Sequence, residues 1–119
     1  MIEITIYRKD INDGAPCYDC ASYICGYRSE GHSDYVPCAV VSALTQMPVI
    51  GMQSCGYKPE IEYSQPMGLL AVRVPESAIK NSAIQLLLNT MSECLGSVAL
   101  QYGDVKVREV EENEQKSKI

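Results

Sequence analysis

A histidine and a cysteine lie close together in one short stretch of this sequence. His32 is the only histidine, and Cys38 follows it six positions later, at the start of a long apolar run. A thiol becomes reactive when it ionises, and a helix N-terminus together with a nearby imidazole favours the thiolate. The pair is therefore a candidate nucleophile and general base, with backbone N–H groups near Cys38 as candidate oxyanion donors.

Each of these residues also has an ordinary structural interpretation. Cysteine is among the residue types most often buried, and this chain contains six. Asp34 either orients His32 or acts as a loop or helix-capping acid, and the second interpretation is favoured. Ser42 lies one helical turn after Cys38, where it either contacts the thiol or a substrate, or bonds back to its own helix.

A second group of cysteines comprises Cys17, Cys20 and Cys25. A C-x-x-C pair binds zinc or cycles as a dithiol in some proteins. Structural zinc usually needs four ligands, and the sequence has no second C-x-x-C and no further histidine. We therefore predict neither a metal site nor a cofactor.

Hydrophobic periodicity predicts five strands. Ile2, Ile4 and Ile6 alternate with polar residues, which is typical of a half-buried strand. Further strand-like segments cover residues 18–31, 60–63, 70–74 and 105–110. The third and fourth are separated by a short turn and are expected to form a hairpin.

Two helices are expected between these strands. The first begins near Pro37, which suits the first turn of a helix, and ends at Gly56. It is apolar on nearly all sides, which predicts a buried central helix kinked at Pro48. The second runs from residues 75–77 to Gly103. The resulting order, β-β-α-β-β-α-β, predicts an α+β fold with a small mixed sheet and two helices packed on it.

Composition indicates one soluble domain. The 119 residues suit a single domain over residues 1–110, followed by a charged tail at 111–119. The net charge of -5, without a basic stripe, argues against a nucleic-acid partner. No signal peptide is visible, and polar residues interrupt the apolar stretches, so we predict no membrane span. A cytoplasmic location is expected, with the cysteines as thiols.

The Gly31–His32 pair and the later run CAVVSALTQ at residues 38–46 resemble the ribosomal-processing cysteine protease family (Prp). Members carry a Gly-His pair at the end of a strand, a loop, and a helix beginning Cys-Ala-x-Val-Ser-x-Leu. The resemblance covers nearly the whole chain, including the N-terminal strand and the run GLLAVRV at residues 68–74.

This resemblance implies a fold, an activity and partners. The fold is a small α+β domain, generally a homodimer. The activity is removal of an N-terminal extension from a large-subunit bacterial ribosomal protein. Cys38 would be the nucleophile, His32 the base, and the loop from Ser33 to Pro37 would gate the substrate.

Two alternatives stay open. The interval between His32 and Cys38 is shorter than in many family members, and Pro37 stiffens it, which is compatible with an inactive peptide- or ribosome-binding module of the same fold. The other alternative is a small metal or redox protein that uses Cys17, Cys20 and Cys25.

Overall fold

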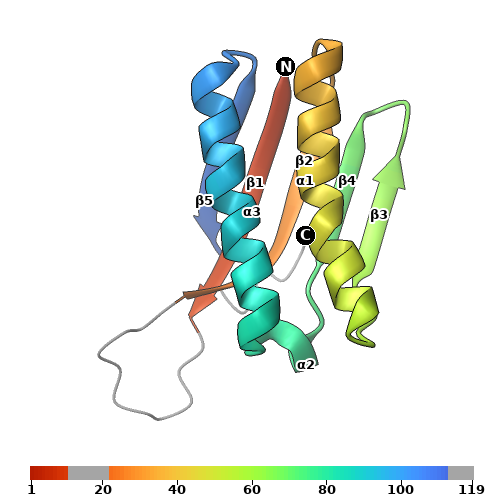
Figure 1. Cartoon of the computed structure of the whole chain (residues 1–119), viewed down its shortest axis with the longest axis vertical. Coiled ribbons are helices and arrows are strands. Elements are labelled where there is room, and N and C mark those ends of the chain that lie inside the picture. The colour runs from red at the N-terminus through yellow and green to blue at the C-terminus, as the bar shows by residue number, and fades with distance from the viewer. Residues whose placement is uncertain (11–21, 113–119) are drawn as a thin grey trace.

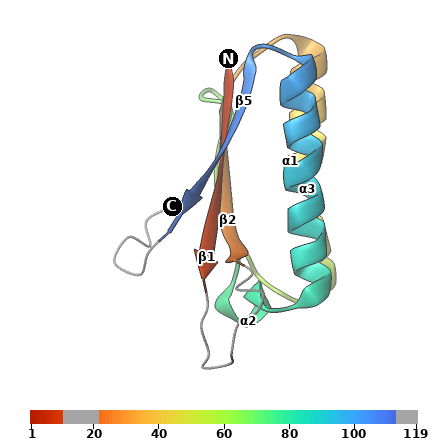
Figure 2. The same ribbon diagram turned by 90° about the vertical axis from the view of Figure 1, so that its left-hand side faces the viewer.

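The protein forms two layers, a five-stranded sheet with helices on one of its faces (Figures 1 and 2). The computed structural model describes residues 1–10 and 22–112. The elements along the chain are β1 (Ile2–Asp10), β2 (Ser22–Gly31), α1 (Tyr35–Ser54), β3 (Glu60–Ser64), β4 (Leu69–Arg73), α2 (Glu76–Ile79), α3 (Ser82–Gln101) and β5 (Val105–Glu111). The predicted α+β fold with a mixed sheet is confirmed.

The strand order is β3-β4-β2-β1-β5. β1 pairs antiparallel with β2 and parallel with β5, while β3 and β4 form the expected antiparallel hairpin. The β1–β2 register places Ile2 opposite Gly31. His32 therefore emerges at the end of the sheet, beside the start of β1.

The core lies between the sheet and the two long helices. Ile2, Ile4 and Ile6 of β1 are buried, as their alternation predicted. α3 faces them with a stripe at helical spacing, formed by the buried residues Ile84, Leu88, Met91 and Leu95. Burial of such apolar area is the main stabilising contribution to a fold of this size.

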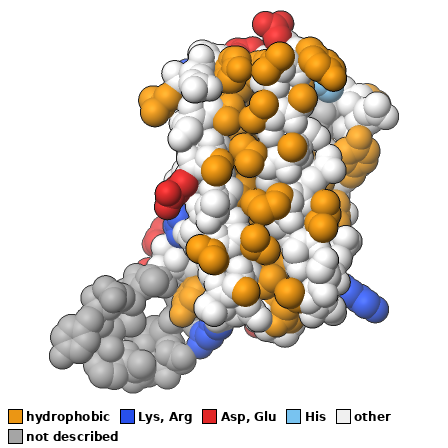
Figure 3. All heavy atoms as spheres, in the orientation of Figure 1, with side chains coloured by type: hydrophobic (Ala, Val, Ile, Leu, Met, Phe, Trp, Pro, Cys, Tyr) orange, Lys and Arg blue, Asp and Glu red, His pale blue; other side chains and the backbone are white. Residues whose placement is uncertain are grey.

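α1 differs from the predicted buried central helix. Its buried residues form a single stripe: Pro37, Val41, Thr45, Pro48 and Met52. The opposite side is open, and Ile50 is 61% exposed. A two-layer fold covers only one side of each helix, so apolar side chains remain on the outer face (Figure 3). Pro48 lies within α1 without ending it, and Gly56 follows the helix at a positive φ of 88°.

The predicted second helix is in fact two helices, so the described residues contain three helices. α2 ends at Ile79, and α3 begins at Ser82. Asn81 separates them because its side-chain oxygen accepts hydrogen bonds from the amides of Ala83 (2.9 Å) and Ile84 (3.1 Å). Apolar periodicity alone predicts one continuous helix here, but the Asn81 N-cap starts a new one.

Other boundaries also shift. α1 begins at Tyr35, two residues before the predicted start at Pro37. β2 is described from Ser22, so the earlier part of the predicted strand at 18–31 falls outside the described residues. Glu111 of the predicted tail belongs to β5, and residues 113–119 also lie outside that description.

α1 and α3, each of 20 residues, are long and apolar enough to cross a membrane by length and composition. This finding does not test the prediction of no membrane span, because the criterion counts only length, mean hydropathy and charged residues. Core helices of soluble proteins meet the same criterion. Here each helix packs one side against the sheet.

Candidate active site

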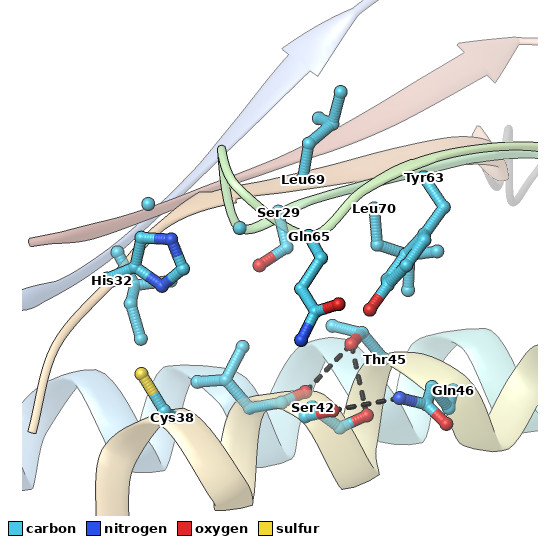
Figure 4. Close-up of a pocket in the computed structure, with 14 residues that line it drawn as sticks. Ser29, His32, Cys38, Ser42, Thr45, Gln46, Tyr63, Gln65, Leu69 and Leu70 are labelled. Atoms are coloured by element: carbon cyan, nitrogen blue, oxygen red, sulfur yellow. Dashed lines mark hydrogen bonds between the residues drawn. The ribbon is translucent and has the colours of Figure 1, made fainter. Parts of the chain in front are cut away.

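A pocket of about 190 Å³ opens between the N-terminal half of α1, the end of β2 and the β3–β4 hairpin (Figure 4). We call it the site pocket. It brings His32 and Cys38 together with residues from all three elements. Its lining residues are Ile2, Ser29, Gly31, His32, Cys38, Val41, Ser42, Thr45, Gln46, Tyr63, Gln65, Gly68, Leu69 and Leu70.

His32 is held from the hairpin side. Its Nε2 lies 3.2 Å from the carbonyl oxygen of Pro66, which lies in the turn between β3 and β4. A carbonyl only accepts hydrogen bonds, so Nε2 carries the proton, and in a neutral ring Nδ1 is then the acceptor. The backbone carbonyl of His32 is fixed as well, because it accepts from the Met1 amine at 2.7 Å. In this tautomer, Nδ1 is the ring nitrogen that can take up a proton.

The turn of the hairpin lies directly against the ring. A Cβ on Gly68 would lie 2.9 Å from His32 Cε1 and 2.4 Å from the carbonyl oxygen of Gly31. Gly68 also has a φ of 59°, in the left-handed region. Only glycine therefore lets the turn approach the imidazole this closely.

Cys38 is the fourth residue of α1, and its thiol points into the pocket toward the His32 ring (Figure 4). Its amide donates to the Asp34 carbonyl (3.1 Å) and is not free to bind an oxyanion. Its Sγ accepts from the Ser33 amide at 3.1 Å and donates to the Ser33 carbonyl at 3.3 Å. Within the described part of the chain, no hydrogen bond joins Cys38 to His32, although both line one pocket.

Ser33 connects the thiol to the far end of the sheet. Its hydroxyl donates to Oδ2 of Asp104, in the turn between α3 and β5. The backbone carbonyl of Asp104 accepts from the amide of Ile2 at 2.8 Å. Neither Ser33 nor Asp104 was singled out as a candidate from the sequence, because they lie 71 positions apart. No local pattern indicates that contact.

The two supporting candidates have different positions. Asp34 is the N-cap residue of α1, yet its side chain makes no capping hydrogen bond and is exposed. Ser42 lines the site pocket on the same helix face as Cys38, as its spacing predicted. Its hydroxyl accepts a hydrogen bond from Nε2 of Gln46 at 2.8 Å. Ser42 is thus placed to meet a ligand, whereas no contact places Asp34 against the imidazole.

Several pocket residues were not identified from the sequence. Gln65 and Tyr63 reach over the pocket from the hairpin (Figure 4). Thr45 continues the α1 face that carries Cys38 and Ser42, and helical spacing alone could have indicated it. Behind it, the Tyr27 hydroxyl donates to the Thr45 carbonyl at 2.5 Å. Burial raises the pKa of Tyr27, so this hydroxyl stays protonated.

Cys25 has a very different environment from Cys38. It is buried, and its thiol lies 3.5 Å from the Tyr7 carbonyl and 3.7 Å from Glu112 Oε1. Burial, together with the nearby Glu112 carboxylate, raises the pKa of Cys25 to about 11. Cys25 is therefore an unreactive thiol near neutral pH.

Of the three cysteines in the alternative metal or redox cluster, only Cys25 lies within the described residues. Cys17 and Cys20 lie outside the described residues. Across residues 1–10 and 22–112, no three His, Cys, Asp or Glu side chains are grouped so that they could hold a metal ion.

A thiol near the start of a helix and an imidazole that lines the same pocket are the two groups that a cysteine hydrolase requires. The family model described as cysteine protease Prp matches residues 1–107. The chain belongs to this cysteine protease family, as its motif predicted. No curated protein sequence matches the chain.

Solved structures show the same fold. The ribosomal processing protease Prp from S. aureus, in complex with a substrate peptide, superposes with a TM-score of 0.68 at 22% identity. That match covers 94% of this chain and 100% of the other. SMU.848 from Streptococcus mutans gives a TM-score of 0.76 at 15% identity, over 94% of this chain and 99% of its own.

Proposed function

We propose that this protein is a cysteine endopeptidase in which Cys38 is the nucleophile and His32 the general base. The observation that carries the proposal is the shared pocket, with His32 Nε2 occupied by the Pro66 carbonyl. Nδ1 is then the ring nitrogen left for the thiol proton. The position of Cys38 in the first turns of α1 adds the favourable field of the helix N-terminus.

The reaction follows from these roles. The Cys38 proton moves to His32 Nδ1, and the thiolate attacks the scissile carbonyl carbon to form a tetrahedral intermediate. Its collapse breaks the C–N bond, and the imidazolium protonates the leaving amine. Water, deprotonated by the same imidazole, then hydrolyses the thioester and regenerates the thiol.

We propose the N-terminal extension of a large-subunit bacterial ribosomal protein as the substrate. Family membership supports this class, since a structurally similar protein is a ribosomal processing protease bound to a substrate peptide. The site pocket supports it physically. Apolar side chains such as Leu70 and Tyr63 lie beside polar ones such as Ser42 and Gln65, a mixture that suits an extended peptide.

The deciding experiment is cleavage of a synthetic peptide that spans such an extension, followed by mass spectrometry. Wild type should cleave at one site, and Cys38→Ser and His32→Ala should lose at least about a hundredfold in rate. Cys55→Ser, at an exposed cysteine outside the pocket, is the matched control and should cleave normally. Cleavage that persists in Cys38→Ser would refute the assignment.

One observation favours an inactive binding module as the second candidate. The Cys38 thiol donates to the Ser33 carbonyl at 3.3 Å, and within the described residues it has no hydrogen bond to His32. If the thiol keeps that partner with peptide present, the pair never assembles. Calorimetric binding of the peptide without any product would support the module, and turnover that depends on Cys38 would exclude it.

We also propose that two copies associate through the outer face of α1 and α3. This face carries large exposed apolar side chains (Figure 3), namely Val36, Ile50, Leu86 and Leu100. Sedimentation velocity should give a dimer for wild type and a monomer for an Ile50→Glu, Leu86→Glu variant. Met67→Glu, at an exposed site on the hairpin, is the control and should leave the dimer intact. A monomeric wild type at micromolar concentration would contradict the proposal.

We expect the protein to act in the cytoplasm, where bacterial ribosomal proteins are made. Cell fractionation should place it in the supernatant after ultracentrifugation. Recovery in the membrane pellet would instead implicate the apolar helices α1 and α3 in membrane contact.

A further inference from the structure

Ser33 makes three contacts that together link the nucleophile to a distant turn. Its amide donates to Cys38 Sγ (3.1 Å), its carbonyl accepts from the same thiol (3.3 Å), and its hydroxyl donates to the Asp104 carboxylate. Ser33 follows the last strand residue of β2 by two positions and precedes α1. The hydrogen bond to Asp104 is the side-chain contact of Ser33, and it ties the segment between β2 and α1 to the turn before β5.

The two backbone contacts favour different protonation states of Cys38. The Ser33 carbonyl can only hold the protonated thiol, whereas the Ser33 amide can donate to the sulfur in either state. A hydrogen bond from an N–H group to an anionic sulfur is stronger than one to a neutral thiol. When the thiol proton leaves for His32, the amide contact persists and strengthens, and it stabilises the thiolate.

Asp104 is well placed to fix that amide. Its own carbonyl accepts from the Ile2 amide (2.8 Å), and the next residue, Val105, starts β5 and pairs with Ile2 in the sheet. The carboxylate therefore projects from a turn whose backbone is hydrogen-bonded to the end of the sheet. It lies outside the site pocket and does not line it.

We propose that Asp104 is a positioning residue for the nucleophile. By accepting the Ser33 hydroxyl, its carboxylate holds the Ser33 amide against Cys38 Sγ and so stabilises the thiolate. This proposal concerns how the thiol of the proposed function is activated. Its test measures thiol reactivity directly, so that it does not depend on identifying the substrate.

The test is the rate at which iodoacetamide modifies Cys38 in the full-length protein, followed by mass spectrometry of the Cys38 peptide. The exposed thiols of Cys55 and Cys94 serve as internal references in the same sample. Asp104→Ala and Ser33→Ala should each slow the modification of Cys38 at pH 7 by roughly three- to tenfold, the effect of one hydrogen bond. The reference thiols should react at unchanged rates.

The conservative variant separates geometry from charge. Asp104→Asn keeps an oxygen that accepts the Ser33 hydroxyl but carries no charge, so it should retain most of the wild-type rate. Glu93→Ala, at an exposed acid on α3, controls for loss of a carboxylate elsewhere and should have no effect. If Asp104→Asn reacts as slowly as Asp104→Ala, an oxygen that accepts the Ser33 hydroxyl does not position the amide, and the positioning role is wrong.

Two further measurements separate positioning from general damage. At about pH 10, well above the pKa of a free thiol, stabilisation of the thiolate no longer limits the reaction, so the rates of wild type and Asp104→Ala should converge. A difference that persists there would mean that access to Cys38 had changed, and would overturn the proposal. In the double variant Ser33→Ala, Asp104→Ala, Cys38 should react no more slowly than in either single variant, because both substitutions remove the same hydrogen bond. Additive losses would contradict the link through Ser33.

The same measurement can refute the catalytic role of Cys38 and the positioning role of Asp104 separately. If Cys38 of wild type reacts no faster at pH 7 than Cys55 and Cys94, the proposed catalytic thiol itself is in doubt. If Cys38 reacts faster and Asp104→Ala leaves its rate unchanged, only the role of Asp104 is wrong. With a cleavable peptide, the Asp104→Ala variant should lower kcat and leave KM within about twofold.

Discussion

The imidazole of His32 and the carbonyl of Pro66 face each other at 3.2 Å across the gap between the end of β2 and the β3–β4 turn. This contact gives the proposed base a fixed orientation without a third side chain. In many cysteine and serine hydrolases a carboxylate or an amide side chain orients the histidine. Here a backbone oxygen occupies that position, and the shape of a hairpin turn therefore determines where the imidazole lies.

Replacing Gly68 by alanine should displace the imidazole. The new Cβ would meet His32 Cε1 and the Gly31 carbonyl, so we expect cleavage to slow by roughly 10- to 100-fold. Gly56→Ala is a matched control, because Gly56 also has a positive φ but nothing within 4 Å of the added carbon. Backbone strain should cost each variant about 1 kcal/mol of stability, and Gly68→Ala should lose more because its Cβ also meets the Gly31 backbone. Equal kinetics in the two variants would show that the Gly68 contact is not important for catalysis.

Removing the Tyr63 side chain should lower the affinity for substrate more than the rate of the chemical step. Tyr63 lines the pocket from the hairpin and is 66% exposed, so Tyr63→Ala is expected to fold normally. Loss of this apolar contact should raise KM by about tenfold and change kcat little. Ile61→Ala provides the comparison, because Ile61 lies on the same strand but does not line the site pocket. A fall in kcat alone would indicate a different role for Tyr63.

Asn81→Ala should destabilise the fold by about 1 kcal/mol, because it removes the acceptor for two amides at the start of α3. Asn81→Asp keeps that acceptor and should restore most of the loss. Urea denaturation followed by circular dichroism measures both changes. A stability of Asn81→Ala equal to that of wild type would show that the cap contributes nothing measurable.

The stability of the fold should fall as the pH rises above about 9. The pKa of Cys25 is raised from 9.0 to about 11 by burial and by Glu112, so the unfolded chain loses this proton first. The contribution to stability is therefore complete below pH 9 and is lost as the pH rises toward 11. Cys25→Ala should show a smaller decrease than wild type in the free energy of unfolding between pH 8 and 10.5. Parallel pH profiles for the two proteins would contradict this explanation.

Much of the fold follows from local patterns in the sequence. The alternation at Ile2, Ile4 and Ile6 predicted β1, and apolar spacing predicted both long helices, because burial of one face imposes a period on the chain. The break at Asn81 was missed, since its side chain caps a new helix within an apolar pattern that continues through it. The exposed face of α1 was missed as well, because composition does not reveal how many layers will cover a helix.

The candidate site likewise has residues that the sequence predicts and contacts that only the tertiary structure shows. The sequence by itself identified His32, Cys38 and Ser42 because their spacing is local and matches a family motif. Only the tertiary structure placed Pro66 and Gly68 against the imidazole, and Asp104 against Ser33. Those contacts join residues that are between 34 and 71 positions apart. They depend on strand pairing and on where turns meet, which a helical or strand period in one segment does not encode.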